Sequence, residues 1–340
     1  MLAWSRLVVL RLPRFTYLAP RTLAEASAML REHESDAMLV AGGTDVFPKM
    51  KRRQFAPPYL VGLSRVPDAA YVRNGTGLRI GALTTLTEVA ESPLVRERYP
   101  ALAQAASVIS TPQLRNAGTL GGNLCLDTRC NWYDQSLFWR TAEGWCMKTH
   151  PEVVCRVAPA SPRCWAVASA DTVPALIALD ANVRIVNAER GERELSLADL
   201  YRDDGIRYLS LDPGDVVAEV VLPPSDGVRA TYRKLRDRGA FDFPIVGVAA
   251  AVRLGDGACA EARIVITATG SSPILIGKAG DALVGTRLED EAIERAADAV
   301  FGAAKPLDNT SGTIAERKRV ARVFTVRALR DLREQQAAGA

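Results

Sequence analysis

Five of the six cysteines in this 340-residue chain lie in one segment, residues 125–164. Clustered thiols can form disulfides, hold a structural metal ion or carry a redox cluster. Most zinc sites contain Cys-x-x-Cys pairs, and none occurs in this segment. The last four cysteines of the segment are instead separated by 16, 9 and 9 positions. This spacing leaves all three kinds of site open.

The composition of the chain narrows the choice among these three kinds of cysteine site. It is 48% hydrophobic and 24% charged, with a formal net charge of +4, which is ordinary for a globular protein and does not indicate nucleic-acid binding. Arg6 and Arg11 interrupt the apolar N-terminal run, which also lacks the cleavage site of a secretion signal. No segment has the ~20 apolar residues of a membrane span. We therefore expect a cytoplasmic protein that binds neither nucleic acid nor membrane, in which clustered cysteines favour metal over disulfides.

Two glycine-rich segments could bind a ligand through their backbone. The first is AGGTD, at 41–45, and the second is GTLGGN, at 118–123. Adjacent glycines allow a close approach to a ligand, and successive free N–H groups bind anions such as phosphate. Neither segment fits the GxGxxG or GxxxxGK[ST] patterns of nucleotide-binding loops. A Gly-Gly pair is also common in simple turns, so the glycines alone decide little.

Regular elements must position these loops. Thr22 and Glu25 form a capping box for a helix over 22–34. AMLVAGGTD is expected to be a short buried strand that runs into the first glycine loop, and PPYLVGLSRV a second such strand, in a small β-α-β unit. Asn74-Gly75 predicts a hairpin. Further helices are expected at 85–92 and 99–109.

The second half of the chain predicts a separate domain. The turn-forming sequence PPSDG, at 223–227, indicates a boundary. We expect an α+β domain over 1–224, including the segment 125–164, and a smaller α+β domain over 225–340. The smaller domain should contain a hairpin around Gly257 and two closing helices, near 288–303 and 315–335.

Four motifs occur together in a recognisable order: AGGTDVFPKMK, TPQLRNAGTLGGN, SADTVPALIALDA and KLRDRGAFDFPIVGVAAA. They resemble the FAD-binding medium subunits of molybdenum hydroxylases, the xanthine dehydrogenase and CO dehydrogenase family, over about residues 13–335. The resemblance implies an α+β fold. It would consist of a vanillyl-alcohol-oxidase-type (PCMH-like) FAD domain in two subdomains, followed by a CO-dehydrogenase-flavoprotein-type C-terminal domain.

The resemblance also implies which residues contact non-covalently bound FAD. Asp171 matches an aspartate near the flavin's sugar-alcohol chain, and Lys234 lies in the segment of a flavin-proximal lysine. A helix N-cap is the alternative role for Asp171. No residue of this chain is expected to be catalytic. The glycine-loop positions carried over from the family are Ala41, Gly42, Gly43, Thr44, Asp45, Thr111, Gly118, Thr119, Gly121, Gly122 and Asn123.

The cysteine segment interrupts the family pattern between the second and third motifs. It resembles the insertion of the 4-hydroxybenzoyl-CoA reductase group, whose flavin subunit carries an additional [4Fe–4S] cluster there. This implies that the cluster ligands are Cys130, Cys146, Cys155 and Cys164. Cys125 lies on the flavin loop and is not expected to be a ligand, and His150 is more simply a solvated residue. Structural zinc remains the alternative. We expect the insertion to be peripheral to the flavin fold, with its aromatic residues forming a small core of their own.

The resemblance implies a function in electron transfer, with the redox chemistry performed by the cofactors. FAD and the cluster would connect a ferredoxin-like donor to a [2Fe–2S] small subunit and a molybdenum large subunit. The phenolic hydroxyl of the substrate would be removed reductively at molybdenum. The alternatives are a flavin subunit of an oxidative molybdenum hydroxylase and a flavin module with structural zinc. Excess basic residues in the insertion, Arg140, Lys148 and Arg156 among them, predict a ferredoxin docking surface; the alternative is that they only solvate or support a loop.

Overall fold

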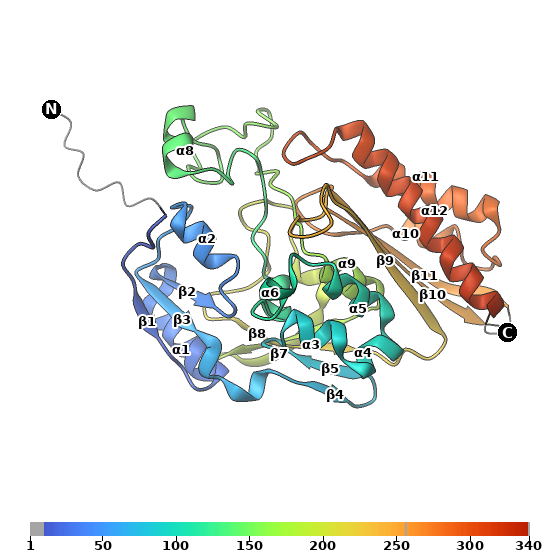
Figure 1. The fold of residues 1–340 in the computed structure, drawn as a ribbon, viewed down its shortest axis with the longest axis horizontal. Coiled ribbons are helices and arrows are strands. Elements are labelled where there is room, and N and C mark those ends of the chain that lie inside the picture. Colours follow the sequence, from blue (N-terminus) through green and yellow to red (C-terminus); the bar gives the residue numbers. More distant parts are fainter. Residues whose placement is uncertain (1–9, 256, 339–340) are drawn as a thin grey trace.

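The computed structural model describes residues 10–255 and 257–338. The apolar N-terminal run considered above as a secretion signal falls mainly on residues 1–9, outside these ranges. The described chain contains three sheets, and the helices α11 and α12 run along one side (Figure 1). The cysteine segment lies on the side of the molecule near α2 and near the start of the C-terminal helices.

The first sheet is small and parallel, with the order β1 (Thr16–Leu18), β3 (Tyr59–Gly62), β2 (Ala37–Val40). Helix α1 (Leu23–His33) packs against it, and the Thr22 hydroxyl accepts a hydrogen bond from the Glu25 N–H. The Glu25 carboxylate accepts from the Arg21 N–H instead of from Thr22. The predicted β-α-β unit is confirmed, and β2 leads directly into the first glycine loop.

The second sheet is antiparallel and has the strand order β4-β5-β8-β6-β7. Its central strand β8 (Val216–Leu222) comes from far along the chain, so this sheet is completed only after the cysteine segment has been passed. The predicted hairpin at Asn74-Gly75 is confirmed, as are the helices that follow it. The other strands and the helices around this sheet are β4 (Val72–Asn74), β5 (Leu78–Gly81), β6 (Asn182–Asn187), β7 (Gly191–Ser196), α3 (Leu86–Glu91), α4 (Pro93–Arg98), α5 (Pro100–Ser107) and α9 (Thr172–Ala178).

The third sheet has the order β12 (Ile274–Leu275), β11 (Ala258–Thr267), β10 (Val246–Gly255), β9 (Val228–Leu235). Successive side chains of a strand point to opposite faces. Val248 and Ala250 of β10 therefore join one core, with the C-terminal helices, while Ala249 and Ala251 join the core of the second sheet. The C-terminal helices are α10 (Gly277–Asp281), α11 (Asp290–Ala303) and α12 (Ile314–Ala338).

This architecture confirms the predicted fold class, the hairpin around Gly257 and both closing helices. The boundary expected at 224–225 falls in the connection between β8 and β9. Strand β9, VRATYRKL, is not among the expected strands, although its first six residues alternate between apolar and polar. No helix within residues 10–255 and 257–338 is long and apolar enough to cross a membrane.

Short elements carry the second glycine loop and the cysteines. Helix α6 (Pro112–Arg115) and helix α7 (Leu120–Leu124) flank this loop, whereas α2 (Val46–Lys51) follows the first one. The cysteine segment contains one helix, α8 (Leu137–Glu143), and is otherwise irregular. An isolated bridge between Arg129 and Val167 joins the start and the end of the segment.

Candidate cofactor-binding site

The two glycine loops meet backbone to backbone. A Cβ atom at Gly42 would lie 1.8 Å from the carbonyl oxygen of Ala117, just before the second loop. Gly43 has a φ of +71°, and its Cβ would lie 2.3 Å from the ring of Phe47. Only glycine fits these two positions without moving the backbone or the ring. The sequence therefore places loops that are far apart along the chain against each other.

Helix caps fix the second loop. The Thr119 hydroxyl accepts a hydrogen bond of 3.1 Å from the N–H of Gly122 at the start of α7. Thr111 caps α6 in the same way, accepting from Leu114 at 3.3 Å. The side-chain oxygen of Asn123 accepts from the Thr172 hydroxyl at 2.6 Å, which ties α7 to α9. These contacts hold the loop rigidly and leave its outer face for a ligand.

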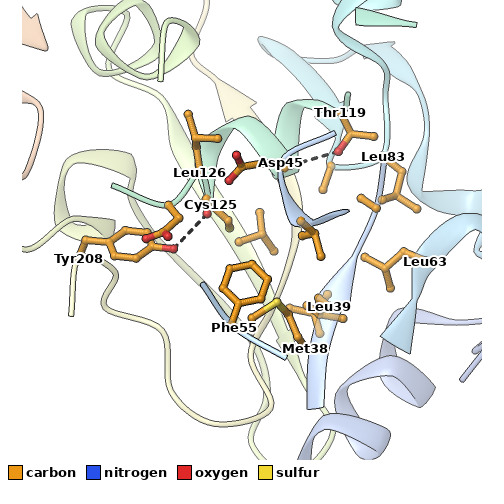
Figure 2. A pocket seen from close by; sticks show the side chains of 18 of the residues that line it. Met38, Leu39, Asp45, Phe55, Leu63, Leu83, Thr119, Cys125, Leu126 and Tyr208 are labelled. Atoms are coloured by element: carbon orange, nitrogen blue, oxygen red, sulfur yellow. Dashed lines mark hydrogen bonds between the residues drawn. The ribbon is translucent and has the colours of Figure 1, made fainter. Parts of the chain in front are cut away.

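Two cavities adjoin the loops. The larger has a volume of about 450 Å³ and is lined mostly by apolar side chains. Figure 2 places Tyr208 on one side of it and Leu63 and Leu83 on the other. The smaller has a volume of about 140 Å³ and includes Phe243 in its wall. A long ligand with a ring system at each end and a phosphate link in the middle suits such an arrangement.

Most of the residues carried over from the family lie in these walls. Asp45, Thr119 and Gly122 line both cavities. Thr111, Asp171 and Lys234 line neither. Ala41 and Gly121 line the larger cavity, and the smaller is lined by Gly42, Gly43, Thr44, Gly118 and Asn123.

Asp171 and Lys234 form a buried ion pair of 2.9 Å. Asp171 stands at the N-cap position of α9, but its side chain makes no capping hydrogen bond, so the capping alternative is wrong. Its carboxylate instead accepts from the Tyr232 hydroxyl at 2.7 Å. Burial raises the pKa of Asp171 and lowers the pKa of Lys234. Lys234 also donates to the carbonyl of Val108, next to the wall of the smaller cavity.

The four cysteines predicted as cluster ligands line one small buried pocket. Cys130, Cys146, Cys155 and Cys164 are each no more than 8% exposed. Cys125 lies apart, in the wall of the larger cavity, and Cys259 lies in the core of the C-terminal sheet. The structure therefore brings together the predicted set and separates the other two cysteines from it.

Burial determines the protonation of these thiols. It raises the pKa of Cys130 to about 12 and that of Cys164 to about 11. Such thiols ionise near neutral pH only when a positive charge, such as a metal ion, compensates the thiolate. Within residues 10–255 and 257–338, no three His, Cys, Asp or Glu side chains are grouped so that they could hold one metal ion.

The surroundings of the pocket come from the cysteine segment itself and from later parts of the chain. Trp132, Tyr133 and Met147 pack against the cysteines. The expected small core is thus confirmed for two of the aromatic residues, whereas Phe138 is 84% exposed. Gly205 lies against Cys164, because a Cβ there would come within 2.7 Å of its sulfur. Asn309, before α12, accepts from the N–H of Asn131 at 2.8 Å and donates to the carbonyl of Trp165 at 2.6 Å.

Tyr133 and Lys148 line both the cysteine pocket and the larger cavity, so they form a shared wall. The Lys148 ammonium donates to Asp127 at 2.7 Å, and Lys49 forms an ion pair with the same carboxylate. Burial by itself would raise the pKa of Asp127, but Lys148 and Lys49 outweigh it and lower the pKa to about 2. Asp127 is therefore an anion at neutral pH.

Comparison with known proteins identifies this arrangement. Residues 13–225 match the family described as the FAD binding domain in molybdopterin dehydrogenase. The chain belongs to the FAD-binding medium subunits of molybdenum hydroxylases. Residues 230–332 of this flavin subunit match the CO dehydrogenase flavoprotein C-terminal domain. FAD is thus its cofactor, and the chain is a component of an oxidoreductase.

Individual relatives agree with this assignment. The flavin subunit is 28% identical to the carbon monoxide dehydrogenase medium chain of Hydrogenophaga pseudoflava, over 93% of this chain and 96% of the relative. It is 34% identical to an aldehyde oxidoreductase FAD-binding subunit of Escherichia coli, over 70% and 77%. The structure of the Hydrogenophaga CO dehydrogenase superposes with a TM-score of 0.79 at 27% identity, covering 95% and 98%.

Two expectations about the cysteine segment of the flavin subunit are wrong. Arg140 is 2% exposed and donates to the carbonyls of Arg52 and Arg53, at 3.0 and 2.8 Å. The side chain of Lys148 is 7% exposed. Arg156 donates to the carbonyl of Trp145 at 2.9 Å. These cations hold the segment in place and do not form an exposed docking surface. The segment is also not peripheral, because Arg140 anchors it beside α2.

His150 does not line the cysteine pocket of the flavin subunit. Its ring stacks on Trp145, with 4.3 Å between the ring centres, so it is not simply solvated. Sequence reasoning did not assign a site role to Asp127, Tyr208 or Phe243, which line the cavities. Asp127 and Tyr208 lie outside the four motifs, and Phe243 lies in the fourth motif without any feature that marks it as a site residue. Only their proximity in the folded chain indicates a role.

Proposed function

We propose that this chain is the FAD- and [4Fe–4S]-carrying electron-transfer subunit of a molybdenum enzyme of the 4-hydroxybenzoyl-CoA reductase type. The observation that carries the proposal is the convergence of Cys130, Cys146, Cys155 and Cys164 on one buried pocket. In this proposal residues 1–224 bind FAD, and residues 225–340 form a C-terminal domain that closes over them.

The glycine loops fit FAD. At Gly42 the backbones of the two loops are in contact. Because Gly42 has no side chain, a phosphate group could approach the loop backbone there. Thr119 and Gly122, which line both cavities, would lie at the middle of the ligand. Bound FAD supplies the exchange between two-electron and one-electron transfer. The residues of this chain bind it, orient it and exclude water from it.

Four cysteines in one pocket support the proposal of a [4Fe–4S] cluster over zinc. A zinc ion would require its ligands about 2.3 Å from one point, and the described residues hold no such group. A cluster presents a separate iron to each of four thiolates and therefore holds them further apart. The pocket offers four buried thiols and no other Asp, Glu or His ligand. The cluster would supply one-electron transfer.

The partners follow from the family. The relatives are medium chains and FAD subunits, so this chain would work with a molybdenum-containing large subunit and a [2Fe–2S] small subunit. Electrons would enter from a ferredoxin-like donor and leave towards molybdenum. Within described residues, the chain offers no second cysteine cluster for [2Fe–2S] centres.

A second candidate is the flavin subunit of an oxidative molybdenum hydroxylase. It is favoured by the names of the relatives, which act on carbon monoxide, aldehydes and nicotinate. The two candidates use the same binding residues and differ in the direction of net electron flow.

One experiment tests both candidates. The native complex is purified without oxygen, and its iron, molybdenum and flavin are measured. It is then assayed for reduction of 4-hydroxybenzoyl-CoA with reduced viologen, and for oxidation of aldehydes and nicotinate with an artificial acceptor. Reductive removal of the phenolic hydroxyl of 4-hydroxybenzoyl-CoA, with four extra irons per flavin, supports the proposal. Oxidation alone would replace it by the second candidate, and the absence of the extra iron would remove the cluster.

A further inference from the structure

Lys148 is held at a single position in the wall between the cysteine pocket and the larger cavity. An ammonium group has three hydrogen-bond donors. Lys148 directs them at the Asp127 carboxylate, the Thr128 hydroxyl and the carbonyl of Gly205. All its donors are therefore satisfied by neighbours inside the protein. The ammonium group is therefore held in place and does not turn towards solvent.

Lys148 belongs to a network of buried charged groups beside the cysteine pocket. Asp127 is shared by Lys148 and Lys49, and the rings of Tyr133 and Tyr208 lie 4.8 and 5.4 Å from the Lys148 ammonium. Lys49 also lies 3.9 Å from Asp45, so the two lysines are matched by two carboxylates. Neither carboxylate lines the cysteine pocket, whereas Lys148 does, so the charge that Lys148 brings to the pocket wall is a local one. The side chains of Lys49 and Lys148 are 0% and 7% exposed. Solvent and salt consequently screen this charge less than they would at the surface.

We propose that Lys148 sets the reduction potential of the [4Fe–4S] cluster, by holding a buried positive charge against the pocket that contains it. This inference rests on the proposed function. Reduction adds one negative charge to a cluster, and the net charge and solvent exposure around a cluster determine its potential. A fixed cation at the pocket stabilises the reduced state and raises the potential. Lys148 would thereby adjust how readily the cluster accepts an electron before FAD does.

The test is a redox titration of the cluster in the purified complex, monitored by its paramagnetic resonance signal. Lys148→Met removes the charge and keeps most of the apolar stem. We expect a more negative cluster potential than in the wild type. Lys148→Arg keeps the charge and should lie near the wild type. Lys278→Met, at an exposed lysine on α10, is the matched control and should leave the potential unchanged.

A second variant, with an expected potential shift in the opposite direction, covers the case in which Lys148→Met loses the cluster. Asp127→Asn removes the negative partner and should move the potential in the positive direction. If Lys148→Met does not retain its iron, this variant decides the question. FAD content is measured in parallel, because Asp127 and Lys148 also line the larger cavity.

The outcomes are distinct. An unchanged potential in Lys148→Met with full iron content overturns the inference and leaves the proposed function intact. An equal shift in Lys148→Met and Lys148→Arg would assign the effect to packing and also overturn it. A wild-type complex without the cluster signal overturns both.

Discussion

Arg129, in the cysteine segment, forms an ion pair with Asp45 of the first glycine loop. Its guanidinium group also lies 4.2 Å from the centre of the Phe243 ring, in the wall of the smaller cavity. Arg129 precedes Cys130 directly. One residue thus connects the cysteine pocket, the first glycine loop and the C-terminal domain, so the cysteine pocket and the flavin site should depend on each other.

Replacement of Arg129 by Gln should weaken FAD binding. It would leave the Asp45 carboxylate with Lys49, 3.9 Å away, as its remaining ion-pair partner, beside the position expected for the phosphates, where negative charges repel. We expect the Kd for FAD to rise about tenfold, which corresponds to about 1.4 kcal/mol. Titration of the flavin-free protein with FAD, followed by flavin fluorescence, measures this. Arg129→Lys should give an intermediate value; an unchanged Kd for Arg129→Gln would contradict the link between the two sites.

Replacement of Gly42 by Ala should abolish FAD retention. Its Cβ would lie 1.8 Å from the Ala117 carbonyl oxygen, so the two loops must separate. Flavin absorbance after gel filtration measures retention, and circular dichroism shows whether the variant is folded. Gly75→Ala is the control, because nothing lies within 4 Å of a Cβ at Gly75. A folded Gly42→Ala protein with full flavin would place the phosphates elsewhere.

Replacement of any one pocket cysteine by Ser should remove the iron of the cluster and its broad visible absorption. Each thiolate would bind a different iron, so none can substitute for another. Cys125→Ser and Cys259→Ser serve as controls and should keep the iron, since these cysteines lie outside the pocket. Iron retained in Cys130→Ser but lost from Cys125→Ser would assign the ligands differently.

Replacement of Arg140 by Met should destabilise the protein without changing the salt dependence of electron donation. Arg140 is buried, and its loss leaves the carbonyls of Arg52 and Arg53 without these hydrogen bonds. An unsatisfied buried group costs about 1–3 kcal/mol, so we expect a loss of that size in the free energy of unfolding. Denaturant unfolding measures it, with Arg207→Met, at an exposed position, as control. A selective effect on ferredoxin-driven turnover would restore the docking hypothesis.

Glu219 should make stability depend on pH in the acid range. Burial tends to raise its pKa, but hydrogen bonds from Arg79 and Tyr71, with Arg184 nearby, lower it overall. A carboxyl group with a lowered folded-state pKa contributes stability above its unfolded pKa of about 4.3 and loses this contribution as the pH falls further. The difference in unfolding free energy between wild type and Glu219→Gln should therefore shrink below that pH. A difference that stays constant with pH would show that the carboxylate charge is not responsible.

The sequence predicts the elements that rest on local signals. The capped helix α1, the hairpin at Asn74-Gly75 and the hairpin of β10 and β11 all have their own turns and periodicity. Strand β9 alternates over only its first six residues and was not recognised beside the resemblance motif that begins at Lys234. The identity of the cofactor came from resemblance, since the glycines alone fit ordinary turns equally well.

The environment of charged side chains in the cysteine segment was predicted wrongly from the sequence. Arg140 and Lys148 lie in a polar, irregular segment, and such residues are mostly exposed. Their partners are carbonyl groups and a carboxylate from distant parts of the chain, which no local pattern indicates. The pairing of Arg129 with Asp45 is likewise invisible before folding, because the two residues belong to separate motifs.

The contacts of Asn309 have a consequence for biosynthesis. This residue bonds to the backbone on both sides of the cysteine pocket, at Asn131 and Trp165. A ribosome makes the chain from its N-terminus, so all the pocket cysteines emerge well before Asn309 does. During that interval the backbone at Asn131 and Trp165 lacks the two hydrogen bonds that Asn309 supplies, so the segment around the pocket reaches its final set of contacts only after the C-terminal domain has been made.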